Sequence, residues 1–141
     1  MKITVSTEIE APAAVVWRCY TTPGDIVCWN AASDDWHTTS ASVDLQAGGR
    51  FCSRMEAKDG SVGFDFEGVY TRVVEAQLLE YDFGERHAEV RFTEHDGGTT
   101  VTVAFDAEET HSIEQQHEGW KAILGNFKRY VESSATPAKA P

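Results

Sequence analysis

The sequence predicts an α+β fold in which a curved seven-stranded antiparallel sheet wraps around one long C-terminal helix, with two short helices after the first strand. Residues 112–134 place apolar side chains at helical spacing and polar ones on the opposite face, which indicates an amphipathic helix of about six turns. Residues 35–106 consist almost entirely of strand-like runs separated by short turn sequences. Such short connections imply antiparallel neighbours, because parallel strands need crossovers of a dozen residues or more.

The first strand is expected at Lys2–Ile9, where apolar and polar residues alternate and indicate one buried face. Pro12 follows at a position where a helix can begin, so a short helix is expected at residues 13–20. A second short helix is expected at residues 25–30, because Pro23 is expected to interrupt the helical structure before it. Together these helices are expected to close one end of the sheet.

Six further strands are expected between residues 35 and 106. They are Trp36–Leu45, Arg50–Ala57, Gly63–Val74, Leu78–Phe83, His87–Glu94 and Thr99–Asp106. Their separators are rich in Gly and Asp, and Asp96-Gly97-Gly98 is the strongest hairpin signal among them. Gly48 and Gly49 are expected to form a turn that needs a positive φ angle.

The long helix carries an apolar stripe, and Ser112 is expected to be its N-cap, because serine is one of the preferred N-cap residues. The stripe consists of Ile113, Trp120, Leu124, Phe127 and Val131. Gly119 costs about 1 kcal/mol relative to Ala in a helix interior, so we expect either a close approach of helix to sheet or a ligand against its backbone. The chain is thus expected to form one domain at residues 1–134, followed by a flexible Ala- and Pro-rich tail at residues 135–141.

Composition excludes several classes of partner. The chain has 141 residues with 23 Asp and Glu against 12 Lys and Arg, a formal net charge of -11. Such a field repels nucleic acids and anionic membrane surfaces. The sequence contains no run of 18 apolar residues, so membrane insertion is not predicted. The three cysteines fit reduced thiols better than a disulfide framework. We expect a soluble cytoplasmic protein that is a monomer or a homodimer.

A sheet that curls around a single helix does not close perfectly against it. The gap is expected to become an internal cavity, which is the usual kind of site for a small molecule. Trp29 and Trp36 lie on either side of the expected mouth. They either clamp a flat apolar ligand, with Asn30 or His37 orienting it, or form a structural aromatic cluster under a loop.

Charged residues alternate with apolar ones on the two strands that flank the Asp59-Gly60 turn. Arg54 and Asp65 therefore lie on the face opposite to Met55 and Phe66. One interpretation is a solvated outer face with Arg–carboxylate pairs across the strands. The other places Arg54 and its carboxylate partners inside the fold, where such a pair persists only with further hydrogen bonds or a ligand. The alternation fits both registers.

These observations define a set of candidate residues for ligand binding. They are Trp29, Trp36, His37, Arg54, Met55, Glu56, Asp65, Phe66, Gln116, Trp120 and Leu124. His37 has the chemistry of a general acid or base near neutral pH, but the sequence assigns it no partner. The signatures of a nucleophile elbow, a zinc-binding helix and a Walker loop are missing, so no catalytic residue, metal ligand or cofactor is assigned.

Several short motifs follow one another along almost the whole chain. They are Ala11-Pro12, Val16-Trp17, Trp29-Asn30, Asp35-Trp36-His37, Gly48-Gly49-Arg50-Phe51, residues 54–60, residues 63–68 and Gly119-Trp120. In this order they resemble the START-like superfamily (SRPBCC, Bet v 1-like), which includes Bet v 1 allergens and polyketide cyclases. The chain is most similar to the bacterial AHSA1-like branch, which is related to the C-terminal domain of the Hsp90 ATPase activator.

The resemblance implies a helix-grip fold with a cavity for a hydrophobic ligand of aromatic, polyketide-like or lipid-like type. Three functions follow from it in the order in which we rank them. The first is binding of such a ligand, and the second is interaction with a chaperone ATPase of the Hsp90 type. The third is a cyclase- or hydrolase-type reaction in the same cavity, in which His37, Glu56 or Asp65 moves a proton.

Overall fold

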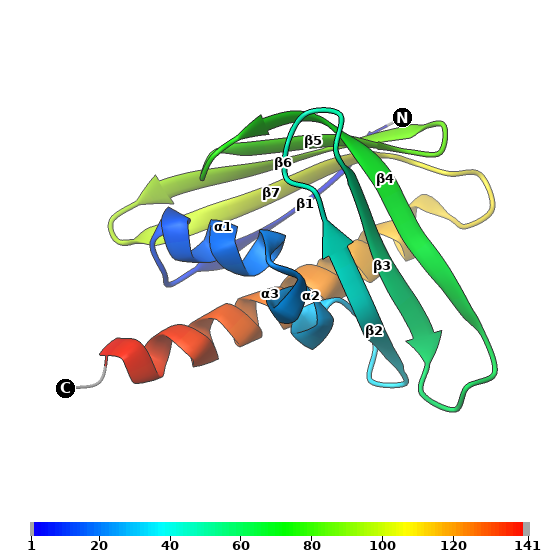
Figure 1. Ribbon diagram of the computed structural model, residues 1–141, viewed down its shortest axis with the longest axis horizontal. Helices are drawn as coiled ribbons and strands as arrows, with labels where there is room; N and C mark the ends of the chain where they lie inside the picture. Colours follow the sequence, from blue (N-terminus) through cyan, green and yellow to red (C-terminus); the bar gives the residue numbers. More distant parts are fainter. Residues whose placement is uncertain (1, 140–141) are drawn as a thin grey trace.

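The computed structural model describes residues 2–139, with side chains described through residue 133. Seven strands form one antiparallel sheet, and three helices lie on its concave side (Figure 1). The strands are β1 (Lys2–Ile9), β2 (Trp36–Val43), β3 (Arg50–Ala57), β4 (Gly63–Val74), β5 (Leu78–Phe83), β6 (Arg86–His95) and β7 (Gly98–Asp106). The helices are α1 (Ala13–Thr21), α2 (Pro23–Trp29) and α3 (Ile113–Lys139). The predicted helix-grip α+β class is confirmed.

The strand order is β1-β7-β6-β5-β4-β3-β2, so the first and last strands in sequence are neighbours. Lys2 of β1 lies opposite Asp106 of β7 at one end of this pair. The predicted hairpin between β6 and β7 is present, but its loop contains only Asp96 and Gly97. Both residues have positive φ angles, 45° and 81°, as a two-residue hairpin loop of type I′ requires. Gly98 therefore belongs to β7 and pairs with His95.

Two irregularities bend the sheet on the side that carries β2 to β5. The register shifts between Thr38 and Ser40 in β2, and between Tyr70 and Arg72 in β4. A residue left out of the ladder bends its strand and increases the local twist. Figure 1 shows β2, β3 and β4 running at a steep angle to β5, β6 and β7, with α3 passing along the concave side.

The start of α3 is fixed by a reciprocal pair of hydrogen bonds. The Gln115 backbone N–H donates to Ser112 Oγ at 3.0 Å, and the Ser112 N–H donates to Gln115 Oε1 at 3.1 Å. This is the arrangement of a capping box, and it confirms Ser112 as the N-cap. The helix continues to Lys139, beyond the expected end at Ser134. Residues 140 and 141 lie outside the described residues, and the expected flexibility of residues 135–141 stays a prediction.

The apolar stripe of α3 packs into the core over its second half. Leu124, Phe127 and Val131 are buried. Ile113 was expected in the stripe but is 44% exposed, because the buried stripe begins one turn later, at Gln116. No helix in residues 2–139 combines the length and hydropathy that a membrane crossing requires.

Candidate functional site

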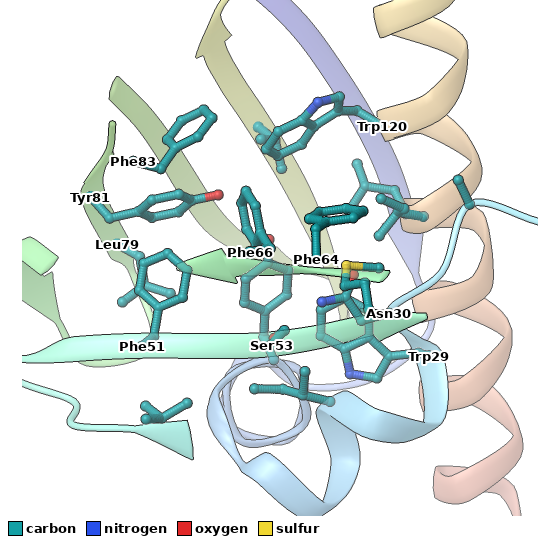
Figure 2. Close-up of a pocket in the computed structure, with 18 of the residues that line it drawn as sticks. Trp29, Asn30, Phe51, Ser53, Phe64, Phe66, Leu79, Tyr81, Phe83 and Trp120 are labelled. Carbon is teal, nitrogen blue, oxygen red and sulfur yellow. The ribbon is translucent and has the colours of Figure 1, made fainter. Parts of the chain in front are cut away.

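A cavity of about 450 Å³ lies between the concave face of the sheet and the first half of α3 (Figure 2). Its walls come from nearly every part of the fold: α1, α2, the loop before β2, strands β2 to β7 and α3. The aromatic lining residues are Tyr20, Trp29, Trp36, Phe51, Phe64, Phe66, Tyr70, Tyr81, Phe83 and Trp120. Cavities of a few hundred cubic ångströms with such apolar walls are typical of small-molecule sites.

Strand alternation on β3 and β4 settles which face is the wall. Phe51, Ser53 and Met55 point into the cavity, and Phe64 and Phe66 lie beside them on β4. The pairs are Met55 with Phe64 and Ser53 with Phe66. Of the candidate residues, Met55 and Phe66 are thus brought together on the cavity wall.

Arg54, Glu56 and Asp65 occupy the opposite, outer face, so their assignment to the cavity is wrong. Arg54 lies opposite Asp65 in the β3–β4 ladder. Its Nε donates to Glu56 Oε2 at 3.0 Å and its Nη1 donates to Asp65 Oδ1 at 3.4 Å. This is the cross-strand pairing that the sequence left as one of two interpretations. The apolar residues that alternate with these charged ones occupy the inner face, because burying an ion pair would remove both charges from water.

Trp120 forms the wall at the α3 side. Its indole stacks on Phe105, with ring centroids 4.1 Å apart and an interplanar angle of 17°. The rings of Phe66 and Phe83 have their centroids 6.2 Å from that of the same indole. Figure 2 labels all three side chains on the cavity wall. Leu124, one turn further along α3, also lines the cavity. Stacking on Phe105 therefore fixes the orientation of the Trp120 indole, and part of this ring faces the cavity.

Gly119 precedes this tryptophan. Two explanations were expected for a glycine at this position: a close approach of the helix to the sheet, or a ligand against the helix backbone. A Cβ atom added at Gly119 would meet no atom within 4 Å. Close approach of helix to sheet therefore does not explain the glycine. A ligand against this backbone stays a prediction.

Trp29 and Trp36, the two tryptophans expected at the mouth of the cavity, do not form one clamp. Trp29 is buried, donates from Nε1 to the Cys19 carbonyl at 3.0 Å, and contacts the rings of Tyr20 and Phe127. Trp36 instead pairs with Phe64 at 5.8 Å. Phe64 is 49% exposed although it lines the cavity, so the Trp36–Phe64 pair marks the opening.

His37 and Gln116 do not line this cavity. His37 is exposed and borders a second, more polar depression outside the mouth, together with Lys58 and Arg129. Gln116 is buried, but its side-chain amide forms hydrogen bonds with the segment before α3. It accepts from the Glu108 N–H at 2.8 Å and donates to the carbonyls of Glu108 and His111 at 3.0 and 2.9 Å. Its role is to anchor the first turn of α3.

Three tyrosines that line the cavity were not predicted from the sequence: Tyr20 on α1, Tyr70 on β4 and Tyr81 on β5. Burial raises the pKa of Tyr70 to about 12. Burial, with the neighbouring tyrosines, also raises the pKa values of Tyr20 and Tyr81 well above 10. All three therefore stay neutral hydroxyl donors at any physiological pH. The spacing from Phe66 to Tyr70 along one strand face was a usable signal.

One group of possible metal ligands exists among the described residues. Ligand atoms of Cys52, Asp65 and Glu67 lie within 4.8 Å of one another on the outer face of β3 and β4. Both carboxylates are exposed. Burial and the adjacent carboxylates raise the pKa of the Cys52 thiol, which disfavours the thiolate that a metal requires. We therefore assign no metal to this group.

Fold and cavity together define a helix-grip protein with an internal aromatic chamber. The family model described as "Activator of Hsp90 ATPase homolog 1-like protein" matches residues 10–132. The chain thus belongs to the AHSA1-like family, a branch of the SRPBCC or Bet v 1-like superfamily.

Solved structures agree with this assignment. The chain is 49% identical to the AHSA1-like protein from Aeromonas hydrophila, with a TM-score of 0.90, over 96% of this chain and 94% of that one. It is 43% identical to Chr148 from Cytophaga hutchinsonii, with a TM-score of 0.81 and the same coverages, 96% and 94%. Protein NE0264 from Nitrosomonas europaea shares the fold at 19% identity, with a TM-score of 0.82 over 96% and 97% of the two chains. Comparison with curated proteins found no match.

Proposed function

We propose that this protein binds a hydrophobic small molecule, aromatic, polyketide-like or lipid-like, in the cavity between the sheet and α3. The observation that carries the proposal is the void itself: about 450 Å³ remains open behind a wall of aromatic rings. A folded protein normally fills such space with its own side chains. An apolar ligand would gain roughly 25 cal/mol for each Å² removed from water.

The opening supports access to this space. Phe64 and Trp36 are the residues of the cavity wall that reach the surface at the β3–β4 end. Ser33 and Ala32 of the preceding loop line the same side. A ligand can therefore enter past two side chains and one loop without separation of the sheet from α3.

A thermal-shift assay with a panel of apolar aromatic and aliphatic compounds tests the proposal. A compound that binds only the folded state raises the unfolding temperature with its concentration. Ile123→Trp, on the α3 wall of the cavity, should fill the space and remove the shift. Lys121→Trp adds the same ring on the exposed side of α3 and should keep it. Absence of any shift across the panel, or an equal shift in Ile123→Trp, would refute ligand binding here.

A second candidate is a chaperone ATPase partner of the Hsp90 type, favoured by the family description and by the exposed Val62 and Phe64 on the β3–β4 hairpin. This function predicts that purified Hsp90 ATPase activity rises when the protein is added, and that Val62→Ser with Phe64→Ser removes the rise. Ligand binding in the cavity predicts no such effect. A reaction driven by His37, Glu56 or Asp65 is not proposed, because none of the three lines the cavity.

A further inference from the structure

The cavity contains hydroxyl groups that the protein itself does not use. Tyr70 and Tyr81 are 6% and 5% exposed, and both line the void. Among the described residues, neither hydroxyl has a hydrogen-bond partner, and neither oxygen is fully enclosed, because no fully buried side-chain nitrogen or oxygen atom among these residues lacks a partner. The same holds for Tyr20 and for Ser53, whose side chains line the same void. Figure 2 shows the Tyr81 hydroxyl pointing into the cavity toward Phe66.

The tyrosines form one cluster, which we call the tyrosine cluster: Tyr20, Tyr70 and Tyr81. Tyr70 and Tyr81 are direct cross-strand partners on β4 and β5, with ring centroids 6.5 Å apart. Their rings are held in place by Phe51, which contacts Tyr70 at 5.1 Å and Tyr81 at 4.9 Å. Tyr20 approaches from α1 and is fixed by Trp29 and Phe127. The donors are therefore positioned before any ligand arrives.

An unpaired hydroxyl in an apolar cavity is unfavourable, so a ligand that offers an acceptor gains a hydrogen bond as well as apolar burial. Arg86 is the one charged residue among those that line the cavity. Its Nε already donates to the Asp106 carbonyl at 3.0 Å, and its guanidinium lies 4.6 Å from the Phe83 ring centroid. The N–H groups of its two Nη atoms have no hydrogen-bond partner among the described residues, so Arg86 is a further donor for an oxygen atom of the ligand.

We propose that the ligand of this cavity is a flat apolar compound that carries a carbonyl-type acceptor oxygen, and that the hydroxyls of Tyr70 and Tyr81 donate to this oxygen. The inference rests on the proposed ligand-binding function. Rings on several sides of the void, Phe51, Phe66 and Phe83 among them, suit the faces and edges of an aromatic body. The tyrosine cluster would then set which end of that body lies deepest.

Two probes of the same shape test the hydrogen bond. 2-Acetylnaphthalene carries a carbonyl, and 2-isopropenylnaphthalene replaces its oxygen with a CH2 group. Isothermal titration should show that the ketone binds more tightly, by about two- to tenfold for each hydrogen bond gained. Tyr81→Phe and Tyr70→Phe keep the rings of the wall, so each should lower the ketone affinity and leave the alkene affinity unchanged. Tyr130→Phe, whose hydroxyl donates to Asp25 instead, is the matched control.

The carbonyl stretching band of the bound ketone gives a readout that a structural role would not move. It should shift to lower frequency on binding to the unchanged protein and return toward its value in an apolar solvent in Tyr81→Phe. Equal affinities for both probes, or a ketone affinity that both Tyr→Phe changes leave intact, would refute the acceptor while leaving the binding function in place. Failure of both probes to bind would overturn the inference, and the compound panel then decides the binding function separately.

Discussion

The two halves of this molecule use the same pattern of inward-facing residues but fill their interiors differently. In the half formed by β1, β6 and β7 with α1 and the later turns of α3, the core consists of buried side chains, several of which have no exposed surface. Val16, Val101, Phe105, Phe127 and Val131 are each 0% exposed. In the half formed by β2 to β5 with the earlier turns of α3, inward-facing rings such as Phe66 and Trp120 are only half-buried, because they border the cavity.

The difference follows from where α3 lies. The helix packs directly against β1, which pairs with β7, so inward residues there meet a helix surface at once. Strands β2 to β4 bend away after the register shifts, and their inward residues face open space. Trp120 stands at the boundary, since it stacks on Phe105 of the filled half and meets Phe66 of the hollow half edge-on. Alternation thus decides which residues are inside, whereas the distance to the helix decides whether they form core or cavity.

The largest expected effect compares one ring from each half. Phe127→Ala should lower the free energy of unfolding by about 3–5 kcal/mol, because the ring is completely buried between Tyr20 and Trp29. Phe66→Ala should cost only about 1–2 kcal/mol, because its ring already borders a void. Urea denaturation of both variants provides the measurement. Equal losses would mean that the two halves are packed alike.

A buried hydroxyl in the filled half should come next. Thr99, at the start of β7, is 0% exposed, and its Oγ1 donates to the Ala11 carbonyl before α1 at 2.8 Å. Thr99→Val keeps the shape but leaves this carbonyl without its donor, so the free energy of unfolding should fall by about 1–3 kcal/mol. Thr93→Val, at an exposed position on β6, is the control. A Thr99→Val protein as stable as the unchanged one would show that the carbonyl finds another partner.

The hollow half should tolerate an added methyl group on α3. Gly119→Ala should raise the free energy of unfolding by up to about 1 kcal/mol, because alanine favours the helix and the new Cβ meets no atom within 4 Å. Gly68→Ala is the opposite case, since its Cβ would lie 2.3 Å from the Asp82 carbonyl oxygen and 2.9 Å from the Phe51 ring. Thermal unfolding of both variants distinguishes the two situations. Loss of stability in Gly119→Ala would indicate that the helix is closer to the sheet than described.

The smallest effect concerns the outer face of the sheet and depends on pH. Hydrogen bonds from His87 to Asp82 and Glu80, at 2.6 and 3.0 Å, raise the pKa of its imidazole. A group with a raised pKa in the folded state adds stability below its unfolded pKa of about 6.5, and this contribution disappears as the pH rises through the folded value. The stability difference between the unchanged protein and His87→Gln should therefore be larger at pH 5.5 than at pH 9. The same stability difference at both pH values would contradict the assignment.

Much of the fold could be predicted from the sequence because its signals are local. Turn sequences such as Asp96-Gly97 fix where strands end, and period-two alternation identifies the two faces of each strand. The α3 stripe was correct at Leu124, Phe127 and Val131 but wrong at Ile113. That error has a physical reason, since helical spacing does not show where along its length a helix meets the sheet.

The candidate site was predicted less well because it depends on non-local geometry. Met55 and Phe66 were placed on one face correctly, but the alternation left two registers open for Arg54 and Asp65, which were kept as cavity candidates and in fact face outward. Gln116 looked like a ligand contact, and only the structure shows that it bonds to the segment around Glu108. The tyrosine cluster joins residues from α1, β4 and β5, and no local pattern brings these three elements together.

The pairing of β1 with β7 has a consequence for how the protein is made. Lys2 can pair with Asp106 only after all the residues between them have been synthesised, and the cavity wall that Trp120 supplies is synthesised later still. Contacts between residues so distant in sequence form slowly. A nascent chain that does not yet contain α3 therefore exposes its ring-lined concave face, and the capacity to hold a ligand arises only once α3 has been added.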